Sequence, residues 1–161
     1  MQISLKEDNV QSILVATDFS DCAGAAFRMA RRLARTFKSR IVVLHVIHQR
    51  RVEAVAQFQG VEAECVLPAL RERAQQQLTQ FLAGGGDDGL EIASMVAVGL
   101  PFQEIAVIAR DLAVDLVVMG GYGKSGRGPI EEVFFGSTAE KVVRLLPCPV
   151  LCVPLEETAE K

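Results

Sequence analysis

Short runs of apolar residues recur along the chain and predict a series of buried β-strands. Five of them are bounded by polar or turn-forming residues, at 12–17 (SILVAT), 41–47 (IVVLHVI), 91–98 (EIASMVAV), 114–120 (VDLVVMG) and 149–154 (PVLCVP). The second and fourth are almost continuously apolar, which is typical of strands covered on both faces of a parallel sheet.

Between the strands, apolar residues recur at spacings of three and four, which predicts amphipathic helices. The stripe over 23–37 follows Ser20, a suitable N-cap residue. The stripe over 101–113 begins at Pro101, which suits the first turn of a helix.

Two further helices are expected, and one segment stays open. The Ser137-x-x-Glu140 spacing predicts a capping box at the start of the last helix. A helix is also expected over 62–83, with a start that Pro68 delays. Residues 48–61 are compatible with a loop or with some helix.

Strands that alternate with helices predict an α/β fold, a doubly wound five-stranded parallel sheet with helices on both faces. The expected strand order is 3-2-1-4-5, and 161 residues suit a single domain over 1–161. Ligands bind such sheets beyond the carboxyl ends of the strands, where the strand order reverses. Asp18 after the first strand and Gly120 at the end of the fourth would then face one crevice.

Charge and cysteine usage narrow the expected partners and compartment. A net charge of −3 and a pI near 5.4 argue against nucleic acid as a partner. A basic cluster (Arg28, Arg31, Arg32, Arg35 and Lys38) is expected to be a solvated helix face. No membrane span or secretory signal is apparent, and four cysteines without metal-like pairing fit a reducing cytoplasm without disulfides.

The glycine-rich segment "GGYGKSGRGPIEEVFFGST" (120–138) carries the candidate chemistry. It is not a P-loop, because Val118 stands where that motif needs its first glycine. Its glycines let backbone N–H groups approach an anion, and Gly136-Ser137-Thr138 opens a helix whose N-terminus favours negative charge. The alternative is a glycine-rich connection before a capped helix, without a ligand.

Several motifs in the same order resemble the universal stress protein (UspA-like) family, of the nucleotide-binding type. They are the nucleotide motif G-x2-G-x9-G-[ST] and the stretches "ILVATDFSDCAGAAF", "VAVGLPFQEIAVIARDLAVDLVVMGGYG" and "GSTAEKVVRLLPCPVLCVP". The resemblance spans almost the whole chain and is weakest over 48–90. It implies the adenine-nucleotide alpha-hydrolase-like variant of the doubly wound fold.

The spacing of the nucleotide motif fits this chain in two frames. Gly123-x2-Gly126-x9-Gly136-Ser137 matches the family spacing, whereas Gly120-x2-Gly123-x12-Gly136-Ser137 is three residues too long. We prefer the second frame, because the fourth strand fixes Gly120 at the crevice. The extra length then lies within 126–132, next to the phosphate contacts.

The resemblance assigns roles to individual residues. Asp18, with Ala16 and Thr17 beside it, would contact the nucleoside, and Val46 would offer a backbone contact to adenine. The remaining contacts, to ribose and phosphates, would come from Met119, Gly120, Gly123, Gly126, Gly136, Ser137 and Thr138. Two residues have simpler alternatives. Asp18 is also suited to favour the start of a helix, and His45 is expected to be a satisfied core histidine.

The function that the resemblance implies is a cytoplasmic stress-response sensor or regulator that binds ATP or a related adenine nucleotide, with or without Mg²⁺. Hydrolysis would be slow at most, since no general base is identifiable. The alternatives are a stress-linked interaction module without nucleotide and a nucleotidyl-transferring enzyme, whose signature loops are absent. The resemblance also implies a homodimer joined through the final strand, over 150–153.

Overall fold

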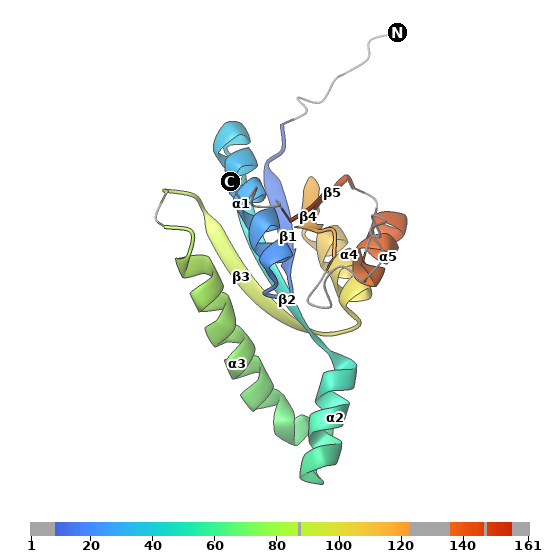
Figure 1. Ribbon diagram of the computed structural model, residues 1–161. Helices are drawn as coiled ribbons and strands as arrows, with labels where there is room; N and C mark the ends of the chain where they lie inside the picture. The colour runs from blue at the N-terminus through green and yellow to red at the C-terminus, as the bar shows by residue number, and fades with distance from the viewer. Residues whose placement is uncertain (1–8, 87, 123–135, 147, 156–161) are drawn as a thin grey trace, which may run out of the picture.

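The computed structural model describes residues 9–86, 88–122, 136–146 and 148–155 of the chain (Figure 1). Its elements are, in order, β1 Ser12–Thr17, α1 Asp21–Phe37, β2 Arg40–His48, α2 Gln49–Gln59, α3 Ala63–Ala83, β3 Ile92–Gly99, α4 Pro101–Asp111, β4 Leu116–Gly120, α5 Ser137–Leu145 and β5 Val150–Val153. Every expected strand is present, with its ends within two residues of the prediction.

The strands form one parallel sheet in the order β3-β2-β1-β4-β5, which confirms the predicted topology. The chain first adds β2 and β3 on one side of β1, and then adds β4 and β5 on its other side. Ala16 in β1 is aligned with Met119 in β4. The carboxyl ends of these two strands therefore meet at the point where the strand order reverses.

Helices cover both faces of the sheet and bury a core on each (Figure 1). On one face, α1 and α3 place Phe27, Ala30 and Leu78 over Val15 and the neighbouring strands. On the other face, α4 and α5 place Ile105, Ala109, Ala139 and Val142 over the same sheet. This two-sided burial is the reason that the central strands are apolar throughout.

Two predicted helix starts are confirmed. Ser20 is the N-cap of α1, and its hydroxyl accepts a hydrogen bond from the Ala23 amide at 3.2 Å. Pro101 lies in the first turn of α4, where its missing N–H costs no hydrogen bond.

The segment that the sequence left open is a helix. Residues 49–59 form α2, and the Nδ1 atom of His48 accepts the Arg50 amide at 3.2 Å as an N-cap. Gly60 ends α2 in the left-handed region, with φ of 66°. The chain then returns as α3, so the two helices form a hairpin beyond the ends of β2 and β3 (Figure 1).

The prediction that Pro68 delays the start of α3 is wrong, because α3 begins at Ala63 and contains Pro68. A proline at this position removes only the bond to the Glu64 carbonyl, and Glu64 is exposed to water. Val66, two residues before Pro68, is buried in one cluster with Val52 and Ala56 of α2. This contact stabilises the first turn of α3.

The predicted solvated face of basic residues on α1 is wrong for Arg31. Its side chain is buried, and Nη2 lies 2.7 Å from Oδ2 of Asp88, while Arg35 approaches the same oxygen at 2.5 Å. Arg31 also donates to the Gly86 carbonyl at 3.1 Å. A Cβ atom at Gly85 would lie 1.9 Å from Nη1 of Arg31, so a larger residue there would displace the guanidinium from this position. The turn before β3 therefore anchors α1 through a paired, buried charge.

This ion pair predicts a pH-dependent stability difference between the parent protein and Asp88→Asn. Burial acts to raise the pKa of Asp88, but hydrogen bonds and charge from Arg31 and Arg35 outweigh it and lower the pKa. A carboxyl with a lowered pKa stabilises the fold above its unfolded pKa, about 4, and loses that contribution as the pH falls further. We expect Asp88→Asn to lower the melting temperature at pH 7 and to approach the parent's value in acid.

Asp111→Asn is the matched control for this prediction. Asp111 pairs with Arg110 at 3.0 Å, but both side chains are more than half exposed, so the pair contributes little. Thermal melts of both variants between pH 3 and pH 7 make the comparison. Equal melting temperatures for Asp88→Asn and the parent at pH 7 would show that the buried pair does not hold the turn to α1.

Candidate functional site

Three contacts hold the turn after β1 in one conformation. Phe19 lies in the left-handed region with φ of 65°, which is uncommon for a residue with a side chain. The hydroxyl of Thr17 accepts the Phe19 amide at 3.0 Å, and the Phe19 ring lies 4.3 Å from the His45 ring, centroid to centroid. His45 in turn lies 2.8 Å from the Thr17 carbonyl through Nδ1.

Because a carbonyl oxygen only accepts, Nδ1 of His45 carries the proton that is donated to Thr17. His45 is thus a satisfied histidine, as the sequence predicts, and its hydrogen bond ties β2 to the turn after β1. These contacts fix the backbone on both sides of Asp18, which lies between Thr17 and Phe19.

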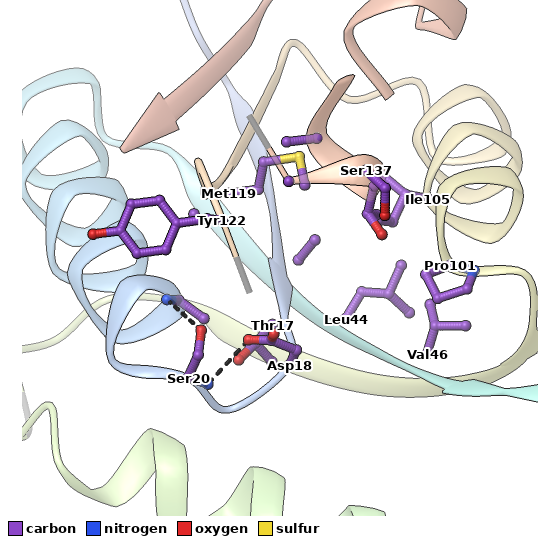
Figure 2. A pocket seen from close by; sticks show the side chains of 16 residues that line it. Thr17, Asp18, Ser20, Leu44, Val46, Pro101, Ile105, Met119, Tyr122 and Ser137 are labelled. Atoms are coloured by element: carbon purple, nitrogen blue, oxygen red, sulfur yellow. Dashed lines mark hydrogen bonds between the residues drawn. The ribbon is translucent and has the colours of Figure 1, made fainter. Parts of the chain in front are cut away.

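Asp18 lies at the carboxyl end of β1 and faces a cavity (Figure 2). One oxygen, Oδ1, accepts the Ser20 amide at 3.0 Å, so the carboxylate also helps to begin α1. The interpretation of Asp18 as a carboxylate that favours the start of a helix is confirmed, and the nucleoside contact stays a prediction. Its side chain is held in place by the helix that it starts, and it borders the cavity.

The other side of the cavity is built where α5 begins. Gly121 donates to the Val153 carbonyl at 3.0 Å, and Gly136 donates to the Gly121 carbonyl at 2.7 Å. These bonds fix the start of α5 against the end of β4, although the two are far apart in sequence. The helix N-terminus is thereby directed at the point where the strand order reverses.

The predicted capping box at Ser137 and Glu140 is wrong. Gly136 is the N-cap, Ser137 is already the first helical residue, and Glu140 pairs with Arg144 at 2.9 Å instead. The first N–H groups of a helix have no acceptor within it, and a glycine N-cap supplies no side chain to take them. The N-terminus of α5 therefore offers donors and partial positive charge to the cavity.

These elements enclose a cavity of about 320 Å³. Its apolar wall is formed by Leu44, Val46, Pro101, Ile105 and Met119, and Tyr122 borders it on the side of α1 (Figure 2). The remaining lining residues are Ala16, Thr17, Asp18, Ser20, Ala23, Gly120, Gly136, Ser137, Thr138 and Ala139.

The structure brings together most of the site residues that the sequence singles out. Those that border the cavity are Ala16, Thr17, Asp18, Val46, Met119, Gly120, Gly136, Ser137 and Thr138. Gly123 and Gly126 lie outside the described residues. β4 ends at Gly120, as the preferred frame of the motif assumes.

Sequence reasoning missed Tyr122 and three residues of the apolar wall, Leu44, Pro101 and Ile105. Leu44 and Ile105 belong to patterns that any buried strand or helix shows, so neither carried a signal of its own. Pro101 was recognised only as a helix start. Tyr122 is the single tyrosine of the chain and stands within the quoted glycine segment, where an aromatic side chain could have been noticed.

The cysteines do not form a second site. All four carry free thiols, and Cys22 is buried with Sγ donating to the Val153 carbonyl at 3.2 Å. Burial raises the pKa of the Cys148 and Cys152 thiols, which makes them less reactive. Within the part of the chain that the structure describes, no three metal-ligating side chains gather, and no helix is long and apolar enough to cross a bilayer.

The fold and the position of the cavity define an α/β protein with a cavity at the switch point of a parallel sheet. The Universal stress protein family matches residues 9–154, and the chain belongs to this family. Universal stress protein MJ0531 of Methanocaldococcus jannaschii is 30% identical over 151 residues, which cover 91% of this chain and 84% of the relative.

Solved structures agree with this assignment. The structure of hypothetical protein MJ0577 has a TM-score of 0.78 at 29% identity and covers 93% of this chain and 99% of its own. A universal stress protein family protein from Arabidopsis thaliana, solved with AMP bound, has a TM-score of 0.61 and covers 94% and 96%. Its identity is 17%, so that likeness concerns the fold alone.

Proposed function

We propose that this protein binds ATP or a related adenine nucleotide in the cavity at the ends of β1 and β4, and acts as a stress-response sensor or regulator. The apolar wall suits a purine ring, which Leu44, Val46 and Ile105 would cover. The Asp18 carboxylate suits hydroxyl groups of a ribose or an adenine amine. With the start of α5, the cavity thus offers one kind of surface for each part of a nucleotide, its base, its sugar and its phosphate.

The observation that carries the proposal is the N-terminus of α5. It borders the cavity with Gly136, Ser137 and Thr138, and the glycine N-cap leaves the first N–H groups to an external acceptor. Phosphate is the acceptor for which such a helix end is suited, because the helix dipole adds to the hydrogen bonds. Hydroxyl groups at 137 and 138 supply further donors.

Asp18 is the one carboxylate among the described residues that line the cavity. A Mg²⁺ ion bound with the nucleotide would therefore take most of its ligands from phosphate oxygens and water. No histidine borders the described part of the cavity, and one oxygen of Asp18 holds Ser20. We infer that any hydrolysis is slow.

Nucleotide binding is tested by identifying what the protein retains and what it takes up. Small molecules released from the purified protein are identified by mass spectrometry, and ATP, ADP and AMP are then titrated by calorimetry. We expect binding that Gly136→Val weakens, because a branched side chain at the N-cap covers the α5 donors. If no binding is detected at about 1 mM nucleotide, the binding free energy is weaker than about −4 kcal/mol. That outcome would favour an interaction module without nucleotide.

We propose further that two copies associate through the outer edge of β5. Among the residues that the structure describes, this strand lies at one edge of the sheet and pairs only with β4, so residues 150–153 present their second edge to a partner. The proposed compartment is the cytoplasm, where free thiols such as those of this chain stay reduced.

A further inference from the structure

The hairpin of α2 and α3 carries an exposed face that neither the nucleotide cavity nor the sheet accounts for. In α2, Val52 and Ala56 are buried against α3 and the end of β2. At 100° per residue, the opposite side of α2 presents Arg50, Ala54 and Phe58, which follow one another at spacings of four. All three are exposed, and 92% of Phe58 is accessible to solvent.

Charge is distributed unevenly along this hairpin. At its base, where α2 leaves β2, four exposed arginines outnumber the exposed Glu53 and Glu72; they are Arg50, Arg51, Arg71 and Arg73. At its tip, Glu62 and Glu64 are exposed at the start of α3. Across the residues that the structure describes, no ion pair involves Arg50, Arg51, Arg73, Glu62 or Glu64.

The charge pattern of one hairpin is complementary to that of a second hairpin that runs in the opposite direction. If a second α2 lies antiparallel to the first, the acidic tip of each hairpin faces the basic base of the other. Phe58, four residues from Ala54 toward the tip, then meets Arg50, four residues from Ala54 toward the base. A guanidinium over an aromatic ring is a favourable pair, and alanine at the centre lets two helices approach closely.

We propose that the outer face of α2 binds the same face of a second copy of this chain, antiparallel, about a twofold axis at Ala54. Figure 1 shows α2 extending beyond the sheet with α3 as its neighbouring helix, so the outer side of α2 is open to a partner. The contact is separate from the edge of β5 and from the nucleotide cavity. A chain that uses both β5 and α2 would form an assembly larger than a dimer.

The expected association is weak, because the face is short. Eleven residues make a helix about 16 Å long, which is less than a standard protein interface needs. We expect a dissociation constant in the micromolar range, as for transient contacts of small area. Association of this strength responds to protein concentration and to salt, since opposite charges face each other across it.

Disulfide cross-linking tests the position of the axis. In a Cys65→Ser background, Ala54→Cys places two thiols across the proposed axis, and mild oxidation should produce a covalent dimer on a non-reducing gel. Gln76→Cys, exposed on α3 and away from this face, is the matched control. A cross-linking rate for Ala54→Cys that does not exceed that of Gln76→Cys would overturn the proposal.

A charge exchange tests the pairing across the axis. Phe58→Arg sets arginine against Arg50 of the second copy and should weaken this association at least about tenfold. Adding Arg50→Glu to Phe58→Arg restores opposite charges across the axis and should restore the association. Neither side chain is buried, so both variants are expected to keep the parent's circular dichroism spectrum.

Sedimentation velocity over about 1–100 µM protein, which spans the micromolar range expected for so short a contact, gives the dissociation constant of each variant. The dissociation constant of Phe58→Arg should be at least about tenfold above that of the parent. The proposal fails if the parent and Phe58→Arg have the same dissociation constant, or if adding Arg50→Glu does not restore the association that Phe58→Arg loses. Neither outcome depends on nucleotide.

Discussion

Replacing Gly136 with aspartate is expected to abolish nucleotide binding while leaving the fold as stable as the parent. Gly136 is the N-cap of α5 with φ of −57° and ψ of 153°, a conformation that aspartate adopts readily. An aspartate N-cap would accept the N–H groups that we propose for phosphate, and its charge would repel the ligand. Charge-assisted hydrogen bonds contribute about 1.5–3 kcal/mol each, so affinity should fall at least about 100-fold.

Two further variants distinguish the effect of the aspartate charge on nucleotide affinity from the effect of its N-cap hydrogen bonds. Gly136→Asn supplies a neutral cap that competes for the same N–H groups and should weaken binding less than Gly136→Asp. Gly136→Ala adds no acceptor and should bind better than either. Calorimetry gives the affinities and urea unfolding gives the stabilities. Unchanged affinity in Gly136→Asp would remove α5 from the binding site and leave the family assignment intact.

The fold could be predicted from the sequence because its pattern has few physical solutions. Apolar runs such as 41–47 alternate with amphipathic segments, and right-handed crossovers then leave a doubly wound sheet. Local chemistry also identified Ser20 as an N-cap, since its hydroxyl acts three residues along the chain. The sequence also predicted that Asp18 and Gly120 lie close together, because Asp18 follows β1 and Gly120 ends β4, which are neighbouring central strands.

What the sequence could not predict depends on partners that are distant in the chain. Arg31 is buried because Asp88, 57 residues away, returns beside it, and helical periodicity contains no sign of that. The capping box failed because a bond from Gly136 to the Gly121 carbonyl fixes where α5 begins. Residues 48–61 were ambiguous because α2 buries few residues, mainly against α3. In each case tertiary contact decided between local alternatives.

Gly120→Ala is expected to destabilise the protein by about 1–3 kcal/mol, the usual cost of overpacking a core. Gly120 borders the cavity, and a Cβ atom at this position would also face α1. A Cβ atom there would lie 2.9 Å from Sγ of Cys22 and 3.1 Å from the Cys22 carbonyl carbon. Contacts this short require β4 or the first turn of α1 to move, and both border the cavity.

The matched control is the next residue, Gly121, which has the same chemistry but more space. A Cβ atom at Gly121 would meet nothing closer than the Val153 carbonyl oxygen at 3.8 Å, an ordinary contact, so Gly121→Ala should change the stability by no more than about 0.5 kcal/mol. Cys22→Ala removes the nearest of the clashing atoms and leaves the backbone contact. In urea unfolding, Gly120→Ala should therefore cost less in the Cys22→Ala background, with a coupling of about 0.5–3 kcal/mol. If the two substitutions are additive, Gly120 is required for some reason other than the close approach of α1.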